Sequence, residues 1–197
     1  GDDALISLAG PANKQGRIIA DNICGGDSHY LGSQGSSVIK VFDMTAATTG
    51  INETNAKKSG LEVDTVILSP MSHAGYYPGG KVMTMKVVFE KETYRLLGAQ
   101  IIGYEGVDKR IDVLATAIHA GLKATQLKDL DLAYAPPYSS AKDPVNMAGF
   151  MIDNIAKGTL KQWHLEDMDK ISRDKSVVLL DVRTVGEFNR GHMDGFK

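Results

Sequence analysis

Two apolar runs separated by a short polar turn place the strongest constraint on the fold of this chain. The segments "KVMTMKVVFE" (residues 81–90) and "RLLGAQIIGY" (95–104) are rich in β-branched and other apolar residues, and only "KETY" lies between them. Strands joined by so short a connection must pair antiparallel, because a parallel pair needs a crossover of about a dozen residues or more. The sequence therefore predicts an antiparallel hairpin.

Further strand-like segments flank a short helix before the hairpin. Residues 36–43, "SSVIKVFD", and 61–69, "LEVDTVILS", are rich in β-branched residues, a composition that favours strands. Between them, "NETNAKKSG" (52–60) offers an asparagine N-cap and a terminal glycine, which together predict a short helix. These segments are expected to extend the hairpin into a larger sheet.

Two longer helices are predicted after the hairpin. Apolar residues recur at helical spacing in residues 106–123, and Asp143 caps a second helix that has Pro144 at its first position and ends near Gly158. The residues expected on the buried faces are Ile111, Leu114, Ala115, Ile118 and Leu122 in the first helix, and Val145, Ala148, Met151, Ile152 and Ile155 in the second. The predicted fold class is α+β, an antiparallel sheet with helices packed on one face.

The two ends of the chain differ from this middle part. Near the N-terminus, a helix is predicted from Pro11 through Ile23, and a Gly/Ser-rich loop follows it. Beyond Gly158, the sequence predicts a tether, an amphipathic helix and a continuously apolar strand, "VVLL", which suits a sheet covered on both faces. We expect three segments: residues 1–36, the sheet domain 37–158, and the incomplete start of a second, α/β-type domain at 159–197.

Charge and cysteine content argue against several classes of function. A formal net charge of -2 argues against nucleic acid or an anionic membrane as the main partner. The single cysteine, Cys24, is incompatible with an internal disulfide framework, a Cys-x-x-Cys pair or a zinc cluster, and no metal site is predicted from the histidine spacing. The longest apolar runs fall far short of the roughly 20 residues of a membrane span. We expect a cytoplasmic protein.

The loop "DLAYAPPYSSAKDPVN" (131–146) contains a candidate for chemistry. A phenol stays protonated at neutral pH, so Tyr138 can donate a hydrogen bond to a sulfur atom as negative charge develops there. The two prolines before it restrict the backbone that presents the ring. The alternative is a packed loop tyrosine whose hydroxyl finds a backbone partner. Lys142, Asp143 and Asn146 are equally well explained as residues that cap and solvate the helix.

Four ordered motifs spanning most of residues 5–157 carry a resemblance to a known family. The chain resembles the C-terminal interface (dimerisation) domain of the FAD-dependent pyridine nucleotide-disulfide oxidoreductases, in the coenzyme A-disulfide reductase branch. That branch includes NAD(P)H-dependent persulfide reductases with a fused rhodanese domain. The motifs are "LAGPANKQGR" (8–17), "KVFDMTAATTGINE" (40–53), "SHAGYYPGG" (72–80) and "APPYSSAKDPVN" (135–146).

The C-terminal segment "VVLLDVRTVGEFNRGHMDGFK" (177–197) is similar to the start of a rhodanese domain. The resemblance places the rhodanese catalytic cysteine, the redox cysteine of the reductase and both of its nucleotide fingerprints outside this sequence. We therefore expect a fragment of a longer enzyme that is inactive alone, binds no FAD by itself and has no sulfurtransferase activity.

The resemblance also implies roles for individual residues. Tyr138 would reach across a dimer to the sulfur chemistry of the partner subunit. Tyr77, rather than its neighbour Tyr76, would supply a second phenol near bound coenzyme A. Residues 1–36 would be the remnant of the FAD-binding domain, and the positive end of its helix would lie against the flavin, through Ala9, Gly10, Pro11 and Ala12. An ordinary helix start is the alternative for these four residues, since proline near a helix N-terminus predicts it equally well.

The function implied by the resemblance is that of a homodimeric reductase. NAD(P)H would reduce FAD, FAD would reduce an active-site cysteine, and that cysteine would reduce a coenzyme A disulfide or persulfide. Two alternatives stay open. One is a free-standing nucleotide-binding module that uses the Gly/Ser-rich loop, and the other is the interface domain of an NADH oxidase or peroxidase.

Overall fold

The computed structural model describes residues 5–197 and contains two compact units, one ending at Thr159 and the other comprising Leu160–Lys197. Residues 1–4, which begin the predicted segment 1–36, lie outside the described residues. The predicted domain boundaries after residues 36 and 158 stay predictions.

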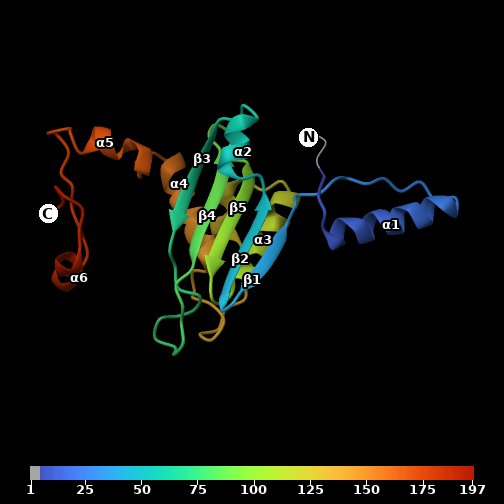
Figure 1. The fold of residues 1–197 in the computed structure, drawn as a ribbon, viewed down its shortest axis with the longest axis horizontal. Helices are drawn as coiled ribbons and strands as arrows, with labels where there is room; N and C mark the ends of the chain where they lie inside the picture. Colours follow the sequence, from blue (N-terminus) through green and yellow to red (C-terminus); the bar gives the residue numbers. More distant parts are fainter. Residues whose placement is uncertain (1–4) are drawn as a thin grey trace. The chain divides into compact units, whose positions relative to one another are not determined.

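In the described residues of the first unit, 5–159, a five-stranded antiparallel sheet forms the centre (Figure 1). The strands lie side by side in the order β1-β2-β5-β4-β3. β4 and β5 pair antiparallel across the short turn, so the predicted hairpin is confirmed. The bounds of the strands are β1 Ser37–Val41, β2 Met44–Gly50, β3 Val63–Leu68, β4 Thr84–Glu90 and β5 Leu96–Gly103.

β2 is the strand that the sequence patterns do not predict. Its sequence, MTAATTG, consists mostly of small side chains and threonines without apolar alternation. It nevertheless pairs along both edges, with β1 through Ser37↔Thr48 and with β5 through Thr45↔Gly103. Hydrogen bonding to two neighbouring strands, rather than side-chain propensity, stabilises this strand.

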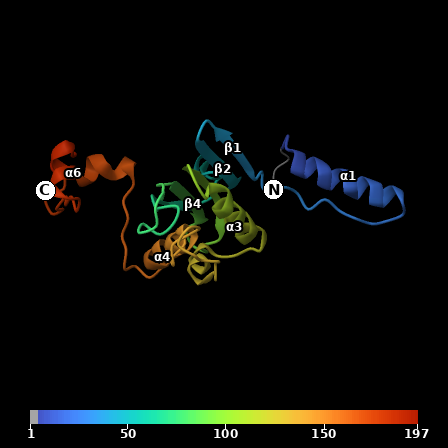
Figure 2. The same ribbon diagram turned by 90° about the horizontal axis from the view of Figure 1, so that it is seen from below.

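Helices α3 (Val107–His119) and α4 (Pro144–Ala156) pack on one face of the sheet, as predicted (Figure 2). The short 3₁₀ helix η1 (Ala124–Asp129) packs against α4. Together they cover the main core, which comprises Ala47, Val66, Met83, Met85, Val87, Phe89, Leu96, Ala99, Ile101, Val107, Ile111, Leu114, Ala117, Ala124, Leu127, Val145, Ala148 and Ile152. The predicted α+β class is confirmed.

The short helix α2 (Glu53–Lys58) packs on the opposite face. Its Ala56 forms a second, smaller cluster with Val63 and Val88, whereas the adjacent Val87 belongs to the main core. Because alternate residues of a strand point to opposite faces, α2 must cover part of the other side of the sheet. The Asn52 side chain caps this helix, accepting a hydrogen bond of 2.8 Å from the Asn55 amide, as the sequence predicts.

The buried stripe of α3 is rotated from the predicted one. Ile111 and Leu114 are buried as expected, but Ala115, Ile118 and Leu122 are only partly buried. In their place, the helix buries three residues that the pattern does not single out: Val107, Arg110 and Ala117. The pattern does not find the charged one because a cation is normally assigned to the solvent side of a helix.

α1 (Ala9–Ile23) begins two residues before the predicted start at Pro11. Pro11 therefore lies within the first turn, where a missing N–H leaves no intrahelical bond unmade. None of the side chains of α1 is buried. No helix in the described part of the chain is long and apolar enough to cross a membrane.

Glu53 ties α2 to the sheet. Its carboxylate forms ion pairs with Lys57 on the same helix and with Lys86 on β4. These two hydrogen-bonded lysines lower the pKa of Glu53 to about 2. A carboxyl whose pKa is lowered by folding stabilises the folded state above its unfolded pKa, and this contribution disappears as the pH falls through the folded value.

Glu53→Gln is therefore expected to lower the free energy of unfolding at pH 7 by an amount that shrinks between about pH 4.5 and pH 2. Below that window the Glu53 carboxyl of the parent protein is protonated as well, and the two proteins should have similar stabilities. Urea unfolding at a series of pH values measures the difference. A difference that stayed constant down to pH 2 would contradict the role of the ionised carboxylate.

The second unit contains little regular structure. Its helices are η2 (Leu165–Asp167), α5 (Met168–Ile171) and α6 (Val185–Arg190), so the predicted amphipathic helix is reduced to short turns. The predicted strand at residues 177–180 does not form, and this expectation is wrong. In the described part of the unit, Asp181 N donates to Lys197 O at 2.8 Å and Lys197 N donates to Leu179 O at 3.0 Å, whereas Val177 N bonds back to Asp174 O at 3.1 Å within a turn. A β-strand at residues 177–180 would need a longer extended segment beside it to form a ladder of hydrogen bonds.

Candidate active-site loops

Two tyrosine-bearing loops lie next to each other at one end of the sheet. The β3–β4 loop (residues 69–83) carries Tyr76 and Tyr77, and the loop before α4 (130–143) carries Tyr134 and Tyr138. Both loops leave the sheet at the end opposite α2 (Figure 1). They are joined by a backbone hydrogen bond of 3.0 Å from the Ala74 amide to the Ser139 carbonyl. The structure therefore brings the two predicted phenols, Tyr77 and Tyr138, into one region.

Tyr138 is presented on a tight turn. The amides of Tyr138 and Ser139 both donate to the carbonyl of Ala135, at 2.9 and 3.1 Å, and the two prolines fill the turn between them. The Tyr138 residue is 71% exposed. At this exposure the residue is not packed inside its own chain.

Tyr77 and Tyr76 have different surroundings. The rings of Tyr77 and the buried His73 form a T-shaped pair, with a centroid separation of 5.5 Å and an interplanar angle of 81°. The Tyr76 hydroxyl instead lies 2.7 Å from the hydroxyl of Tyr134 on the other loop. That hydrogen bond raises the pKa of Tyr134 above its usual value. The choice of Tyr77 over Tyr76 and its role near coenzyme A stay predictions.

Asp143 connects the second loop to α4. Its carboxylate accepts hydrogen bonds from the Val145 amide at 3.0 Å and from the Ser139 hydroxyl at 2.6 Å, and the residue is 2% exposed. Asp143 is thus the predicted helix cap. Asn146 is also structural, since its side-chain amide donates to the Leu127 and Leu130 carbonyls. Lys142 lies over the Phe150 ring, 5.8 Å from its centroid.

Arg110 is the central residue that the sequence patterns miss. It lies in the first turns of α3, is 1% exposed, and forms a buried ion pair with Asp143 at 3.0 Å. Its guanidinium also donates to the carbonyls of Ser72 and Tyr138, at 2.8 and 3.3 Å. Its spacing, three residues after Val107 and four before Leu114, places it on the buried face of the helix and is the sequence signal that could have identified it.

The four residues predicted to face a flavin lie on α1. Ala9, Gly10 and Ala12 are exposed and Pro11 is partly buried. No side chain caps the N-terminus of α1, and a Cβ added at Gly10 would meet no atom within 4 Å. The helix end therefore has room for an anionic group, which is the property that the predicted contact needs.

The Gly/Ser-rich loop after α1 is held by ordinary structural contacts. The Gln34 side chain donates to the Ala115 carbonyl at 3.1 Å, and the Ser36 and Thr49 hydroxyls lie 2.7 Å apart. These side chains attach the end of the loop to α3 and β2. The nucleotide-binding alternative stays untested.

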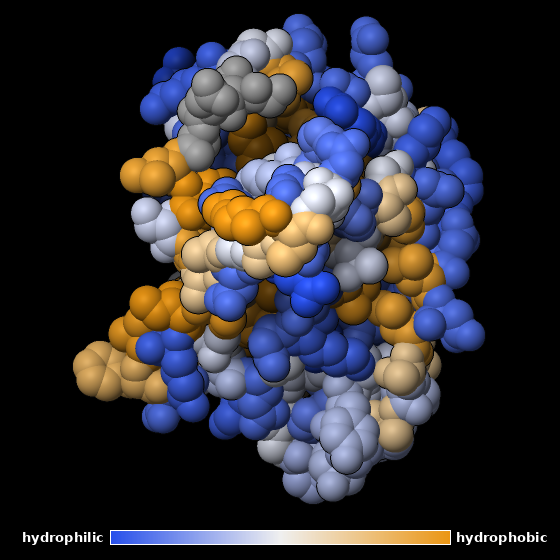
Figure 3. Space-filling view, turned by 90° about the vertical axis from the view of Figure 1, so that its right-hand side faces the viewer, coloured by the Kyte–Doolittle hydropathy of each residue, from blue (hydrophilic) through white to orange (hydrophobic). Residues whose placement is uncertain are grey.

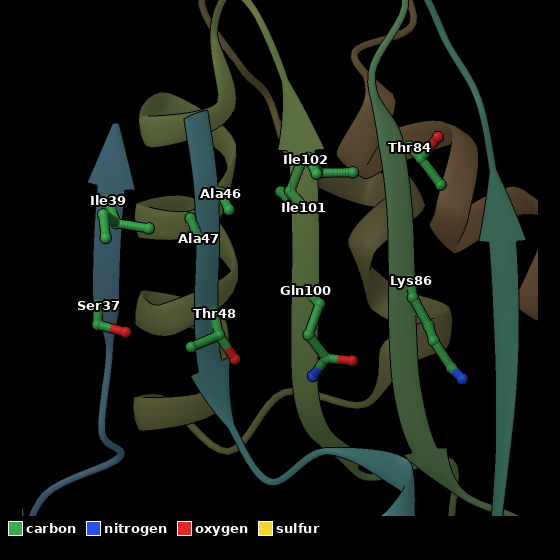
Figure 4. Close-up of a pocket in the computed structure, with 10 residues that line it drawn as sticks. All are labelled: Ser37, Ile39, Ala46, Ala47, Thr48, Thr84, Lys86, Gln100, Ile101 and Ile102. Atoms are coloured by element: carbon green, nitrogen blue, oxygen red, sulfur yellow. The ribbon is translucent and has the colours of Figure 1, made fainter. Parts of the chain in front are cut away.

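The sheet face opposite α3 and α4 is partly open. Figure 4 shows Ile39, Ala46 and Ile102 side by side on three neighbouring strands, above a shallow hollow of about 380 Å³. Ile39 is 61% exposed and Ile102 is 44% exposed. Hydrophobic residues also reach the surface on the side shown in Figure 3, in groups separated by hydrophilic ones. Exposed apolar surface of this kind is typical of proteins that bind other protein surfaces.

A family model describes most of this sheet domain. Residues 36–144 match the pyridine nucleotide-disulphide oxidoreductase dimerisation domain. The coenzyme A disulfide reductase of Staphylococcus epidermidis is 38% identical over 148 residues, which are 75% of this chain and 33% of that protein. The coenzyme A disulfide reductase of Staphylococcus aureus is 36% identical over the same length.

Solved structures extend the likeness to the whole chain. The reduced CoADR-RHD of Bacillus anthracis is 46% identical with a TM-score of 0.93, and the NAD-dependent persulfide reductase of A. fulgidus is 40% identical with a TM-score of 0.89. Each match covers 100% of this chain and 35% of the other. The water-forming NADH oxidase of Lactobacillus brevis is 25% identical, with a TM-score of 0.75 over 81% of this chain and 36% of its own. The chain thus spans about a third of the length of these relatives.

Proposed function

Because this chain belongs to the pyridine nucleotide-disulphide oxidoreductase family through its dimerisation domain, we propose that it is the interface domain of a homodimeric, FAD-dependent NAD(P)H reductase of coenzyme A disulfides or persulfides. The observation that carries the proposal is the pair of tyrosine loops joined at one end of the sheet, with Tyr138 exposed. The oxidase alternative has less support, since that relative is 25% identical whereas two reductases are 40% and 46% identical.

In this proposal the chain supplies hydrogen-bond donors to chemistry that takes place on the partner subunit. The Tyr138 hydroxyl donates to a sulfur atom there as a thiolate develops, and thereby stabilises the leaving sulfur. The tight turn holds the ring before the substrate arrives, so little entropy is lost on binding. Tyr77 supplies a second phenol toward the coenzyme A portion of the substrate.

The N-terminus of α1 is proposed to lie against the flavin, which when bound would supply electron transfer between NAD(P)H and the redox cysteine of the intact enzyme. The uncapped helix end and the open space around Gly10 fit such a neighbour. The residues that would make this contact are Ala9, Gly10, Pro11 and Ala12. The isolated chain is proposed to be inactive, and residues 177–197 are proposed to begin a rhodanese domain.

Tyr138→Phe in the complete enzyme tests the proposed function. We expect turnover of coenzyme A disulfide or persulfide to fall roughly 10- to 100-fold, because the variant lacks the donor to the developing thiolate. The rate of flavin reduction by NAD(P)H should stay within about twofold, because that half-reaction does not use the phenol. Stopped-flow absorbance of the flavin measures both half-reactions separately.

Tyr94→Phe is the matched control, because Tyr94 lies in the β4–β5 turn and stacks on Phe89 rather than lying in either loop. It should leave both half-reactions unchanged. The proposal fails if Tyr138→Phe slows both half-reactions equally, or if it slows neither.

A further inference from the structure

We propose that Arg110 is a positioning residue that holds Tyr138 and Tyr77 in one fixed arrangement for the sulfur chemistry. The inference rests on the proposed function and adds a residue that touches neither substrate nor flavin. It arises from the position of one buried cation between three segments that lie far apart in the sequence. Those segments are the β3–β4 loop, the first turns of α3 and the loop that leads into α4.

The guanidinium of Arg110 binds each of these segments. One terminal nitrogen donates to the Ser72 carbonyl at 2.8 Å, to the Tyr138 carbonyl at 3.3 Å and to the Ser139 hydroxyl at 3.2 Å. The Nε atom and the same terminal nitrogen lie within 3.2 and 3.0 Å of the Asp143 carboxylate. The other terminal nitrogen donates to the Gly106 carbonyl at 3.1 Å. Both loops are thus attached to one rigid, planar group.

These contacts lead directly to the two rings. Tyr138 itself provides one of the carbonyl acceptors, so a shift of the guanidinium moves the backbone that carries the phenol. Ser72 immediately precedes His73, whose buried ring packs against the ring of Tyr77. The Ala74–Ser139 backbone hydrogen bond then couples the two loops to each other. A displacement on either loop is therefore transmitted to both phenols.

The surroundings are shaped for a guanidinium. Gly106 has a φ of +67°, and a Cβ built there would lie 2.0 Å from the Arg110 terminal nitrogen. Only glycine leaves room for the side chain at this point. A lysine in the place of Arg110 would supply one ammonium instead of a planar fork, and could not bind the two loops and Asp143 in the same geometry.

A role in stability alone does not account for this arrangement. A buried ion pair contributes little net stability compared with well-packed apolar residues of similar volume. The fixed geometry of its hydrogen bonds, however, orients the backbone segments that accept them. The structure therefore assigns Arg110 to the orientation of the loops, and this effect is separable from stability by experiment.

The test uses the complete enzyme with Arg110→Lys and Arg110→Met, and with Leu114→Ala as the matched control. Leu114 lies one helical turn further along α3 and is fully buried in the core, so its truncation destabilises the same helix without touching the loops. Three quantities are measured for each variant: the rate of flavin reduction by NAD(P)H, the rate of flavin reoxidation by coenzyme A disulfide, and the midpoint of urea unfolding.

Both Arg110 variants are expected to slow reoxidation roughly 10- to 100-fold, since displacement of reacting groups by about 1 Å has effects of this size. Flavin reduction should be nearly unchanged. Leu114→Ala should lower the unfolding midpoint without a selective loss of reoxidation. Combining Arg110→Met with Tyr138→Phe should slow reoxidation little more than the stronger single change, because the two residues act through the same phenol.

Hydrogen–deuterium exchange provides a readout that does not depend on turnover. In the Arg110 variants, the amides of Ala74, Tyr138 and Ser139 should exchange faster together, whereas in Leu114→Ala they should not be affected more than the rest of the domain. Arg110→Lys keeps the charge and is the variant to rely on if Arg110→Met does not fold.

The possible outcomes separate this inference from the proposed function. If Tyr138→Phe slows reoxidation but neither Arg110 variant does so beyond its loss of stability, the positioning role is refuted and the proposed function stands. The same conclusion follows if the effects of Arg110→Met and Tyr138→Phe simply multiply. If Tyr138→Phe does not slow reoxidation, the proposed function and the inference both fail.

Discussion

Asp143→Ala is expected to lower the free energy of unfolding by about 3–5 kcal/mol, the usual effect of removing one partner of a buried ion pair. The variant leaves the guanidinium of Arg110 buried without its carboxylate, and the Ser139 hydroxyl and the Val145 amide each lose an acceptor. Loss of the helix cap alone would account for about 1 kcal/mol. Urea unfolding of the chain, with equal slopes for parent and variant, measures the difference.

Asp153→Ala is the control for Asp143→Ala on the same helix. Asp153 forms ion pairs with Lys128 and Lys157 nearer the surface, where such pairs contribute little to stability. If the two alanine variants lost similar stability, the large effect assigned to the buried pair would be refuted.

Phe89→Ala is expected to have a similarly large effect, about 3–5 kcal/mol, through a different cause. Phe89 is 0% exposed, lies at the irregularity in β4–β5 pairing and stacks on Tyr94 at a centroid distance of 5.9 Å. Its removal leaves a cavity in the main core, and the surrounding strands cannot close it. Thermal or urea unfolding followed by far-ultraviolet circular dichroism measures the loss.

The matched control for Phe89→Ala is Phe150→Ala, since Phe150 is 42% exposed on α4 and its truncation opens no core cavity. We expect a loss of about 1 kcal/mol or less there. In the complete enzyme, Phe89→Ala should not slow flavin reoxidation more than flavin reduction. Phe89 lies at the end of β4 that is remote from the tyrosine loops. A selective loss of reoxidation in this variant would show that any destabilisation of the domain disturbs the phenols.

Much of the fold could be predicted because its signals are local. The hairpin of β4 and β5 follows from two apolar runs and a short turn, and the caps at Asn52 and Asp143 follow from side chains that bond amides a few residues away. β2 could not be predicted, because its stability comes from pairing with two strands that lie elsewhere in the sequence. The apolar segment 177–180 shows the converse: its composition favours a strand, but the described residues provide too short a partner.

The candidate site divides in the same way. The exposure of Tyr138 follows from the prolines that form its turn, and the sequence identifies that loop. The burial of Arg110 depends on acceptors at Ser72, Tyr138 and Asp143, which approach one another only in the folded domain. The spacing of residues along the chain does not predict that these acceptors converge on Arg110. The family resemblance correctly indicated the fold, while the roles of the tyrosines and of α1 stay predictions.

The hydrogen bond between the Ala74 amide and the Ser139 carbonyl has a practical consequence for engineering this domain. We therefore expect the segments 72–80 and 135–143 to be exchangeable only as a pair. A chimera with only one of these segments taken from a homologue would pair backbones of different origin at the Ala74–Ser139 hydrogen bond. Attempts to change substrate preference should therefore transplant both segments together.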